Sequence, residues 1–204
     1  AALPSRGRVL DVGAAGGFFV KAAREAGWEA SGMEPSRGLA EWGRSHLGVD
    51  LREGTLDQPP FPEQAFDAVT MWDTLEHTAD PPAQVRAARR LLRPGGILLV
   101  NYPDIGSWLA RAAGRRWWFL LSVHLYYFTS QTMTRLLRQT GFRPLAFRRH
   151  IQTLSLGYLA EMGRLYSPLL SRTVARTVRA LGLGHVPIPY YAAQTNVIAV
   201  REDA

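Results

Sequence analysis

Short runs that contain apolar residues recur along the chain, between turns with glycine, proline or acidic residues. Each is too short for a helix, so the runs predict buried strands. They are residues 9–12, 29–33, 49–52, 66–72, 97–100, 144–150 and 196–200. Between most of these runs, apolar side chains recur three or four positions apart, as on the buried face of an amphipathic helix. This alternation predicts an α/β fold with helices on both faces of a mostly parallel sheet.

A glycine-rich turn joins the first predicted strand to the first predicted helix. It contains Gly13, Gly16 and Gly17. Glycine lets the backbone approach a ligand closely, and the first turn of the helix has unpaired N–H groups. Asp11, two residues before Gly13, would repel a phosphate group but attract a cation. S-adenosylmethionine has a sulfonium and an ammonium group and no phosphate, so it suits this turn better than a dinucleotide does.

Several motifs of this chain occur in the order and spacing of one known family. The run Asp-Val-Gly-Ala-Ala-Gly at residues 11–16 resembles the first motif of the Rossmann-like S-adenosylmethionine-dependent methyltransferases, which usually have glycine in place of Ala15. Residues 72–81, and the Pro-Gly-Gly turn within residues 91–100, resemble later motifs of that family. Residues 124–128, His-Leu-Tyr-Tyr-Phe, resemble a segment of the branch that includes the ubiquinone-biosynthesis O-methyltransferases.

The resemblance implies one methyltransferase domain over residues 1–204. Its fold would be a three-layer α/β sandwich around a Rossmann-like, seven-stranded mixed sheet with an antiparallel last strand. S-adenosylmethionine would be the cofactor and S-adenosylhomocysteine the product. Many members carry a helical segment before the first strand, and this chain starts almost on that strand, so we expect a shortened N-terminus.

Strand-end positions and the resemblance together predict the cofactor site. Glu34 ends the second strand about 20 residues beyond the glycine turn, where an acidic residue accepts hydrogen bonds from a ribose; the alternative is a helix-capping carboxylate at the surface. The resemblance places the adenine near residues 54–57, with Asp57 as the acceptor because Thr55 replaces the usual aspartate. Trp72 is equally compatible with core packing. The predicted set is Asp11, Gly13, Ala14, Gly16, Phe18, Glu34, Pro35, Thr55, Leu56, Asp57, Trp72 and Asp73.

Two histidines are candidates for a catalytic base, because imidazole has a suitable pKa for removing the acceptor's proton. His124 comes first, since aromatic residues that could surround an apolar acceptor flank it, and His77 comes second. For each, the alternative is a hydrogen-bonded structural histidine. No histidine or carboxylate cluster has metal-ligand spacing in the sequence, so we expect no metal.

Composition narrows the class of partner. The chain carries a net charge of +7, but its arginines are scattered without a basic tail, so we expect a small-molecule acceptor rather than nucleic acid. The absence of cysteine excludes disulfides and thiolate catalysis and fits a cytoplasmic location. The longest apolar run, residues 117–123, is too short to span a membrane. The oligomeric state stays open.

Residues 152–191 predict a helical insertion before the last strand. The helical pattern is interrupted at Pro168, and the second part has Val174 and Val178 on one face and arginines on the other. A lid over an apolar or aromatic acceptor, a dimer contact and a weak contact with an anionic membrane surface are the three interpretations, of which we expect the lid. For the chain as a whole, the alternatives are a non-catalytic domain that binds S-adenosylmethionine or a partner, and a nicotinamide-dependent oxidoreductase. Asp11 and the missing third glycine of the dinucleotide fingerprint disfavour the oxidoreductase.

Overall fold

The computed structural model describes residues 6–163 and 167–202, and the chain divides into two compact units. Unit 1 consists of the chain up to Arg148 together with the residues from Ala193 onward, and unit 2 is Arg149–Ala192. Unit 2 therefore coincides closely with the helical insertion predicted for residues 152–191.

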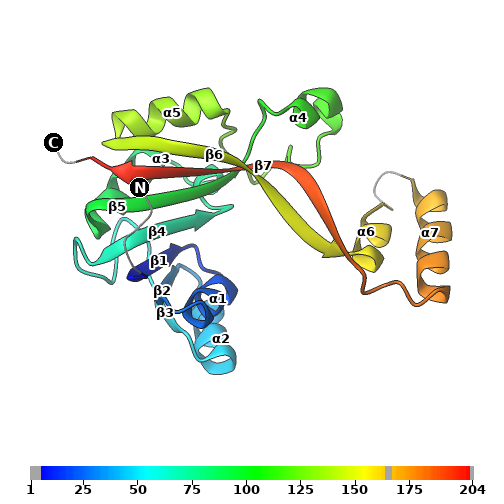
Figure 1. Ribbon diagram of the computed structural model, residues 1–204, viewed down its shortest axis with the longest axis horizontal. Coiled ribbons are helices and arrows are strands. Elements are labelled where there is room, and N and C mark those ends of the chain that lie inside the picture. Colours follow the sequence, from blue (N-terminus) through cyan, green and yellow to red (C-terminus); the bar gives the residue numbers. More distant parts are fainter. Residues whose placement is uncertain (1–5, 164–166, 203–204) are drawn as a thin grey trace. The chain divides into compact units, whose positions relative to one another are not determined.

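A mixed sheet of seven strands has the order β3-β2-β1-β4-β5-β7-β6 (Figure 1). Its strands are β1 (Arg8–Val12), β2 (Glu29–Glu34), β3 (Asp50–Glu53), β4 (Phe66–Trp72), β5 (Leu92–Pro103), β6 (Phe142–Ser155) and β7 (Pro187–Arg201). The pairs among β1 to β5 are parallel, and β7 pairs antiparallel with β5. The predicted mixed sheet with an antiparallel last strand is confirmed. The strand order changes direction between β1 and β4, which is where ligands bind in open α/β sheets.

Helices cover both faces of the sheet in unit 1. Helices α1 (Phe18–Glu25) and α2 (Arg37–Leu47) lie on one face, and α3 (Pro81–Leu91) and α5 (Ser130–Gln139) lie on the other (Figure 1). Val9 packs with the first pair of helices, whereas Leu10 and Val12 pack with the second pair. Alternate side chains of β1 thus serve opposite faces, as the strand period requires. The three-layer sandwich follows from this division of the core.

The sequence predicted that the Pro-Gly-Gly motif forms a turn before the fifth strand. In the structure the motif lies inside β5 instead. Helix α3 ends at Leu91, and the strand begins at the next residue. Phe66 of β4 pairs with Leu92, but Ala68 pairs with Ile97, so the longer side of the ladder must bulge outward. Gly95 takes a φ of 71° in this bulge, a conformation that glycine adopts without strain.

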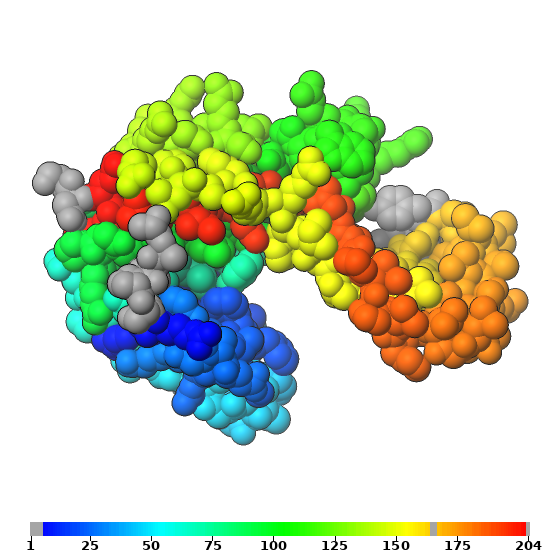
Figure 2. Space-filling model, viewed as in Figure 1, coloured from blue at the N-terminus to red at the C-terminus, as the bar shows by residue number. Residues whose placement is uncertain are grey.

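The connection from β5 to α5 carries two short helices, α4 (Trp108–Ala113) and η2 (Gly114–Arg116). Beyond them the chain is irregular up to Thr129, whose hydroxyl caps α5 as the sequence predicted. Trp117 is only 2% exposed, and its ring lies 5.7 Å from that of Phe119 and 6.2 Å from that of Tyr127. This connection forms part of the green surface in Figure 2. A further short helix, η1 (Leu75–His77), follows β4.

Unit 2 contains α6 (Leu156–Met162) and α7 (Pro168–Ala180), between the outer ends of β6 and β7. The hydroxyl of Ser171 donates a hydrogen bond to the carbonyl of Ala160 and joins the two helices, which lie side by side (Figure 1). The predicted helices are thus confirmed within the described residues; residues 164–166 of the pattern lie outside them. Within unit 2 the predicted apolar face of α7 is only partly covered, because Val178 is buried whereas Val174 is 40% exposed.

Helix α7 ends at Ala180, and Pro187 and Pro189 both belong to β7. Proline is tolerated at the first residue of a strand and where its nitrogen faces away from the ladder. Within the described residues, no helix combines the length and hydropathy that a membrane-spanning segment requires.

Candidate functional site

An open cavity of about 490 Å³ lies beside the ends of the parallel strands of unit 1. Its walls come from the ends of β1 and β2, from the segments that follow β1, β2, β3 and β4, and from the start of α3. They are Val12, Gly13, Met33, Pro35, Gly54, Thr55, Leu56, Asp57, Thr74, Thr78, Ala79, Asp80, Ala83 and Gln84. The volume is that of a small-molecule site. Five of the predicted cofactor residues line this cavity: Gly13, Pro35, Thr55, Leu56 and Asp57.

Asp11 lies inside β1 and is only 4% exposed. The hydroxyl of Thr70, on the neighbouring β4, donates a 2.7 Å hydrogen bond to Oδ1 of Asp11. Burial raises the pKa of Asp11 from 3.8 to about 7, the bond from Thr70 lowers it, and the charge of Glu34 raises it. The carboxyl group is therefore poised between its neutral and ionised forms near pH 7, and a bound cation would favour the ionised form.

Glu34 fastens the glycine turn to the end of β2. Its Oε2 accepts a 2.8 Å hydrogen bond from the backbone N–H of Ala15, and its Oε1 accepts one of 2.9 Å from that of Ser36. The side chain is buried and therefore not a surface carboxylate, and the hydroxyl of Ser36 caps α2 by accepting from Leu39 N–H at 3.4 Å. A carboxylate has about four acceptor positions, so two bonds leave room for ribose hydroxyls.

The rest of the turn is held by backbone bonds to β2. The N–H groups of Gly13 and Ala14 donate to the carbonyl of Met33 at 2.9 and 3.1 Å. Gly13 has a φ of 72°, and a Cβ there would lie 2.8 Å from the hydroxyl of Thr74. Glycine at this position therefore satisfies both the backbone conformation and the close approach.

Gly16 and Phe18 lie beside α2 and do not line the cavity. A Cβ at Gly16 would lie 3.1 Å from the ring of Trp42, and the ring of Phe18 lies 5.7 Å from the same ring. Phe18 is 66% exposed. The sequence placed both residues in the cofactor set because they belong to the turn, and the structure places them on its outer side.

Trp72 and Asp73 lie at the end of β4 and are likewise outside the lining of the cavity. The ring of Trp72 lies 5.3 Å from that of Phe19 on α1. Asp73 has a φ of 46° and accepts a hydrogen bond from the side chain of Gln194 on β7. That bond connects the end of β4 with a strand more than a hundred residues later, within unit 1.

His77 and His124 are brought together although they are far apart in the sequence. Their ring centres lie 4.7 Å apart, edge to face. Nδ1 of His77 lies 3.0 Å from the carbonyl of Val123, and Nδ1 of His124 lies 2.9 Å from that of Phe119. A carbonyl only accepts hydrogen bonds, so each Nδ1 must carry the proton. In the neutral ring, Nε2 is then left with its lone pair.

Glu76 completes this cluster, and the sequence analysis did not single it out. It is 1% exposed, and neither carboxylate oxygen has a hydrogen-bond partner in another described residue. Burial raises the pKa of Glu76 to about 8, its own backbone N–H lowers it, and the charge of Asp73 raises it. The pKa of His124 is lowered, mainly by burial and also by the nearby His77. The hydrogen bond to the carbonyl of Phe119 and the charge of Asp73 act in the opposite direction.

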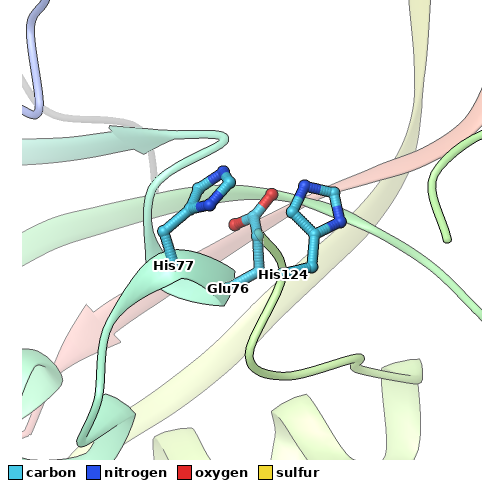
Figure 3. A group of neighbouring side chains, drawn as sticks. All are labelled: Glu76, His77 and His124. Carbon is cyan, nitrogen blue, oxygen red and sulfur yellow. The ribbon is translucent and has the colours of Figure 1, made fainter. Parts of the chain in front are cut away.

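The backbone of Glu76 holds the segment that carries His124. Its carbonyl accepts hydrogen bonds from the N–H groups of Leu125 and Tyr126 at 2.9 and 3.2 Å. Ligand atoms of the glutamate and the two histidines all lie within 4.8 Å of one another, with the carboxylate between the two rings (Figure 3). Thr74 and Thr78, on either side of η1, line the cavity, so the cluster lies next to it. Sequence spacing could not reveal a cluster that is assembled by tertiary contacts.

Comparisons with known proteins identify the family. A family model described as a methyltransferase domain matches residues 1–147, most of the chain. The ubiquinone biosynthesis O-methyltransferase of Dinoroseobacter shibae is 29% identical over 150 residues, which cover 68% of this chain and 60% of that protein. The enzyme of the same name from Alkalilimnicola ehrlichii is 36% identical over 100 residues, which cover 46% of this chain and 40% of that protein. The matched part thus spans about half the length of these relatives.

Solved structures show the same fold. A methyltransferase of Thermotoga maritima, described as S-adenosylmethionine-dependent and a possible histamine N-methyltransferase, has a TM-score of 0.64 and 23% identity, covering 98% of this chain and 84% of that one. One from Methanosarcina mazei has a TM-score of 0.65 and 14% identity, covering 99% and 95%. The [4+2]-cyclase SpnF has a TM-score of 0.63 and 21% identity, covering 100% and 77%. The cyclase shows that this fold alone does not determine the reaction. With the family match over residues 1–147, the chain belongs to the Rossmann-like S-adenosylmethionine-dependent methyltransferase family.

Proposed function

We propose that this protein binds S-adenosylmethionine in the cavity of unit 1 and transfers its methyl group to a small acceptor beside His77 and His124. The observation that carries the proposal is the glycine turn fastened by Glu34 at the edge of that cavity. The family assignment fits it, and the cavity lies at the point where the strand order changes direction.

The residues around the cavity fit this cofactor chemically. Glu34 has acceptor positions left for ribose hydroxyls, and Asp11 favours a cation over a phosphate group. Leu56 and Asp57, both at the cavity wall, are the candidates for an N–H donor and a carboxylate acceptor toward an adenine. The side-chain amide of Gln84 donates to Oδ1 of Asp57 at 3.1 Å and so orients that carboxylate. When bound, S-adenosylmethionine supplies a methyl group on a positively charged sulfur. The thioether that remains after transfer is a good leaving group.

On the acceptor side, the protein orients the nucleophile and removes its proton. The Nε2 atoms of His77 and His124 are the candidate proton acceptors, since the Nδ1 atoms are held by carbonyls. The ring of His124 stacks on that of Phe119, at 6.3 Å between centres, and meets the edge of Tyr127 at 5.8 Å. These aromatic neighbours favour an apolar or aromatic acceptor. The O-methyltransferase relatives support oxygen as the methylated atom.

Calorimetry and mass spectrometry test the proposal. S-adenosylhomocysteine and NADH are titrated separately into the protein, and a panel of phenols, catechols and amines is then incubated with deuteromethyl-labelled S-adenosylmethionine. We expect saturable binding of S-adenosylhomocysteine alone and a labelled product from the phenols or catechols. Binding of NADH instead would support an oxidoreductase. Binding without any labelled product would support the non-catalytic alternative.

A further inference from the structure

Glu76, His77 and His124 have the ligand types of a transition-metal site. Imidazole nitrogen suits zinc, copper, iron and nickel, and two histidines with one carboxylate form a recurrent metal-binding set. Here the three ligand atoms lie within 4.8 Å of one another, and the carboxylate lies between the two rings (Figure 3). No metal is needed to bring them together, because backbone bonds already fix both segments.

Both histidines are oriented as metal ligands are. A histidine that binds a metal through one nitrogen almost always donates its other N–H to a carboxylate, a backbone carbonyl or water. His77 donates to Val123 O and His124 donates to Phe119 O, at 3.0 and 2.9 Å. Each Nε2 therefore keeps its lone pair in a fixed direction.

The carboxylate of Glu76 is an independent observation that points to a cation. Its two oxygens are buried and receive no hydrogen bond from another described residue. A buried carboxylate without a partner is costly, whereas metal coordination is one of the few arrangements that retain buried charge. His77 is exposed, so an ion can reach the cluster from solvent.

We propose that Glu76, His77 and His124 bind a divalent first-row transition cation such as Zn²⁺. Three protein ligands leave at least one coordination position open, as in catalytic zinc sites. This inference rests on the proposed function for its role: the acceptor's hydroxyl oxygen occupies the open position, and the cation lowers its pKa. The hydroxyl proton goes to solvent, a new O–CH₃ bond forms, and the S–CH₃ bond breaks with its electron pair left on sulfur. In this arrangement the Nε2 lone pairs of His77 and His124 bind the cation. The cation, instead of a histidine, then promotes deprotonation of the acceptor hydroxyl.

Cobalt titration tests the site directly. Protein stripped with EDTA is titrated with Co²⁺, followed by its visible absorption, and Zn²⁺ competition then gives the affinity for zinc. We expect one site per chain. Glu76→Gln and His124→Ala each should weaken Co²⁺ binding by more than about 10-fold, since even a supporting residue of a metal site contributes about 10–100-fold. His46→Ala is the matched control, because His46 is exposed and stacked on Trp42 on α2.

The same samples separate this inference from the proposed function. Equal Co²⁺ affinity in the wild type and both variants, or loss only in His46→Ala, would overturn the metal site and leave the proposed methyl transfer intact. Methyl transfer at full rate in the stripped protein would overturn the role of the cation. Intact Co²⁺ binding without S-adenosylhomocysteine binding would instead contradict the proposed function. If Glu76→Gln does not unfold cooperatively, His77→Asn takes its place.

Discussion

The backbone N–H of Ala15 donates its hydrogen bond to the Oε2 atom of Glu34 at 2.8 Å. The bond connects the turn after β1 to the end of β2. Ala15 has a φ of 45°, in the left-handed region that costs a residue with a Cβ about 1–2 kcal/mol. The same carboxylate that is proposed to bind the ribose thus also holds the turn in a strained conformation. Cofactor affinity and local stability are coupled at this residue.

Replacing Glu34 by alanine should weaken S-adenosylhomocysteine binding strongly. Each hydrogen bond to a charged group contributes about 1.5–3 kcal/mol, so we expect a loss of at least about 10-fold, measured by calorimetry. Glu41→Ala is the control, because Glu41 on α2 forms an exposed ion pair with Arg37. Unchanged affinity in a folded Glu34→Ala variant would remove Glu34 from the site.

Replacing Ala15 by glycine should raise the free energy of unfolding by about 1 kcal/mol, because glycine adopts the left-handed conformation without strain. Chemical denaturation measures this effect. In the control Ala22→Gly, in the exposed part of α1, glycine should instead destabilise by about 0.5–1 kcal/mol. A destabilised Ala15→Gly variant would show that the turn carries no such strain.

Cofactor affinity should rise with pH between about 6 and 8. A bound cation favours ionised Asp11, whose pKa in the free protein is raised to about 7, so binding releases a proton below that pH. We expect an increase of up to roughly tenfold across this range, and a flat profile for Asp11→Asn. Calorimetry in two buffers of different ionisation enthalpy measures the released proton. The same slope in both proteins would assign the titration to another group.

The pH dependence of stability gives a second test of Asp11. Its pKa is about 7 in the folded protein against 3.8 as the reference value, so the folded state binds more protons between these values. The free energy of unfolding should therefore fall in the wild type, relative to Asp11→Asn, as the pH rises from about 4 to 7. A constant difference between the two proteins would contradict the raised pKa.

Replacing His124 by alanine should lower kcat much more than it lowers cofactor affinity. A positioned proton acceptor contributes about 10²–10⁴-fold to the rate. Loss of a metal ligand would lower the rate in the same way, and the cobalt titration distinguishes the two roles. His46→Ala should keep its kcat. Normal turnover by His124→Ala would place the reactive group elsewhere.

Deleting Thr153–Pro189 with a short linker should leave cofactor binding nearly intact and abolish methyl transfer. The cavity residues all belong to unit 1, whereas the deleted residues belong to unit 2. The lid interpretation requires this result. Methyl transfer that survives the deletion would leave a dimer contact or a membrane-surface contact, which sedimentation and vesicle binding would then distinguish.

Local patterns in the sequence predicted most of the fold and five of the residues that line the cavity. The strand at residues 66–72, the cap at Ser36 and the turn at Gly13 depend on neighbours in the chain, so their signals are local. The bulge at Gly95 depends on its register against β4, which no single run of residues reveals. Likewise, Glu76 reads as an ordinary polar residue until the fold places His124 beside it.

The backbone contact between Glu76 and Tyr126 joins two parts of the chain to which we assign different proposed roles. The residues that line the proposed donor pocket lie between Val12 and Gln84, with Asp11 directly before them, whereas the aromatic neighbours of His124 come from the connection between β5 and α5. Two main-chain hydrogen bonds to the carbonyl of Glu76 hold that connection beside η1. Two side chains add to them: His77 donates to the carbonyl of Val123, and the hydroxyl of Tyr126 donates to the carbonyl of Ala79. Residues 105–128 could therefore be exchanged between relatives as a cassette that changes which acceptor is methylated while the donor pocket is kept.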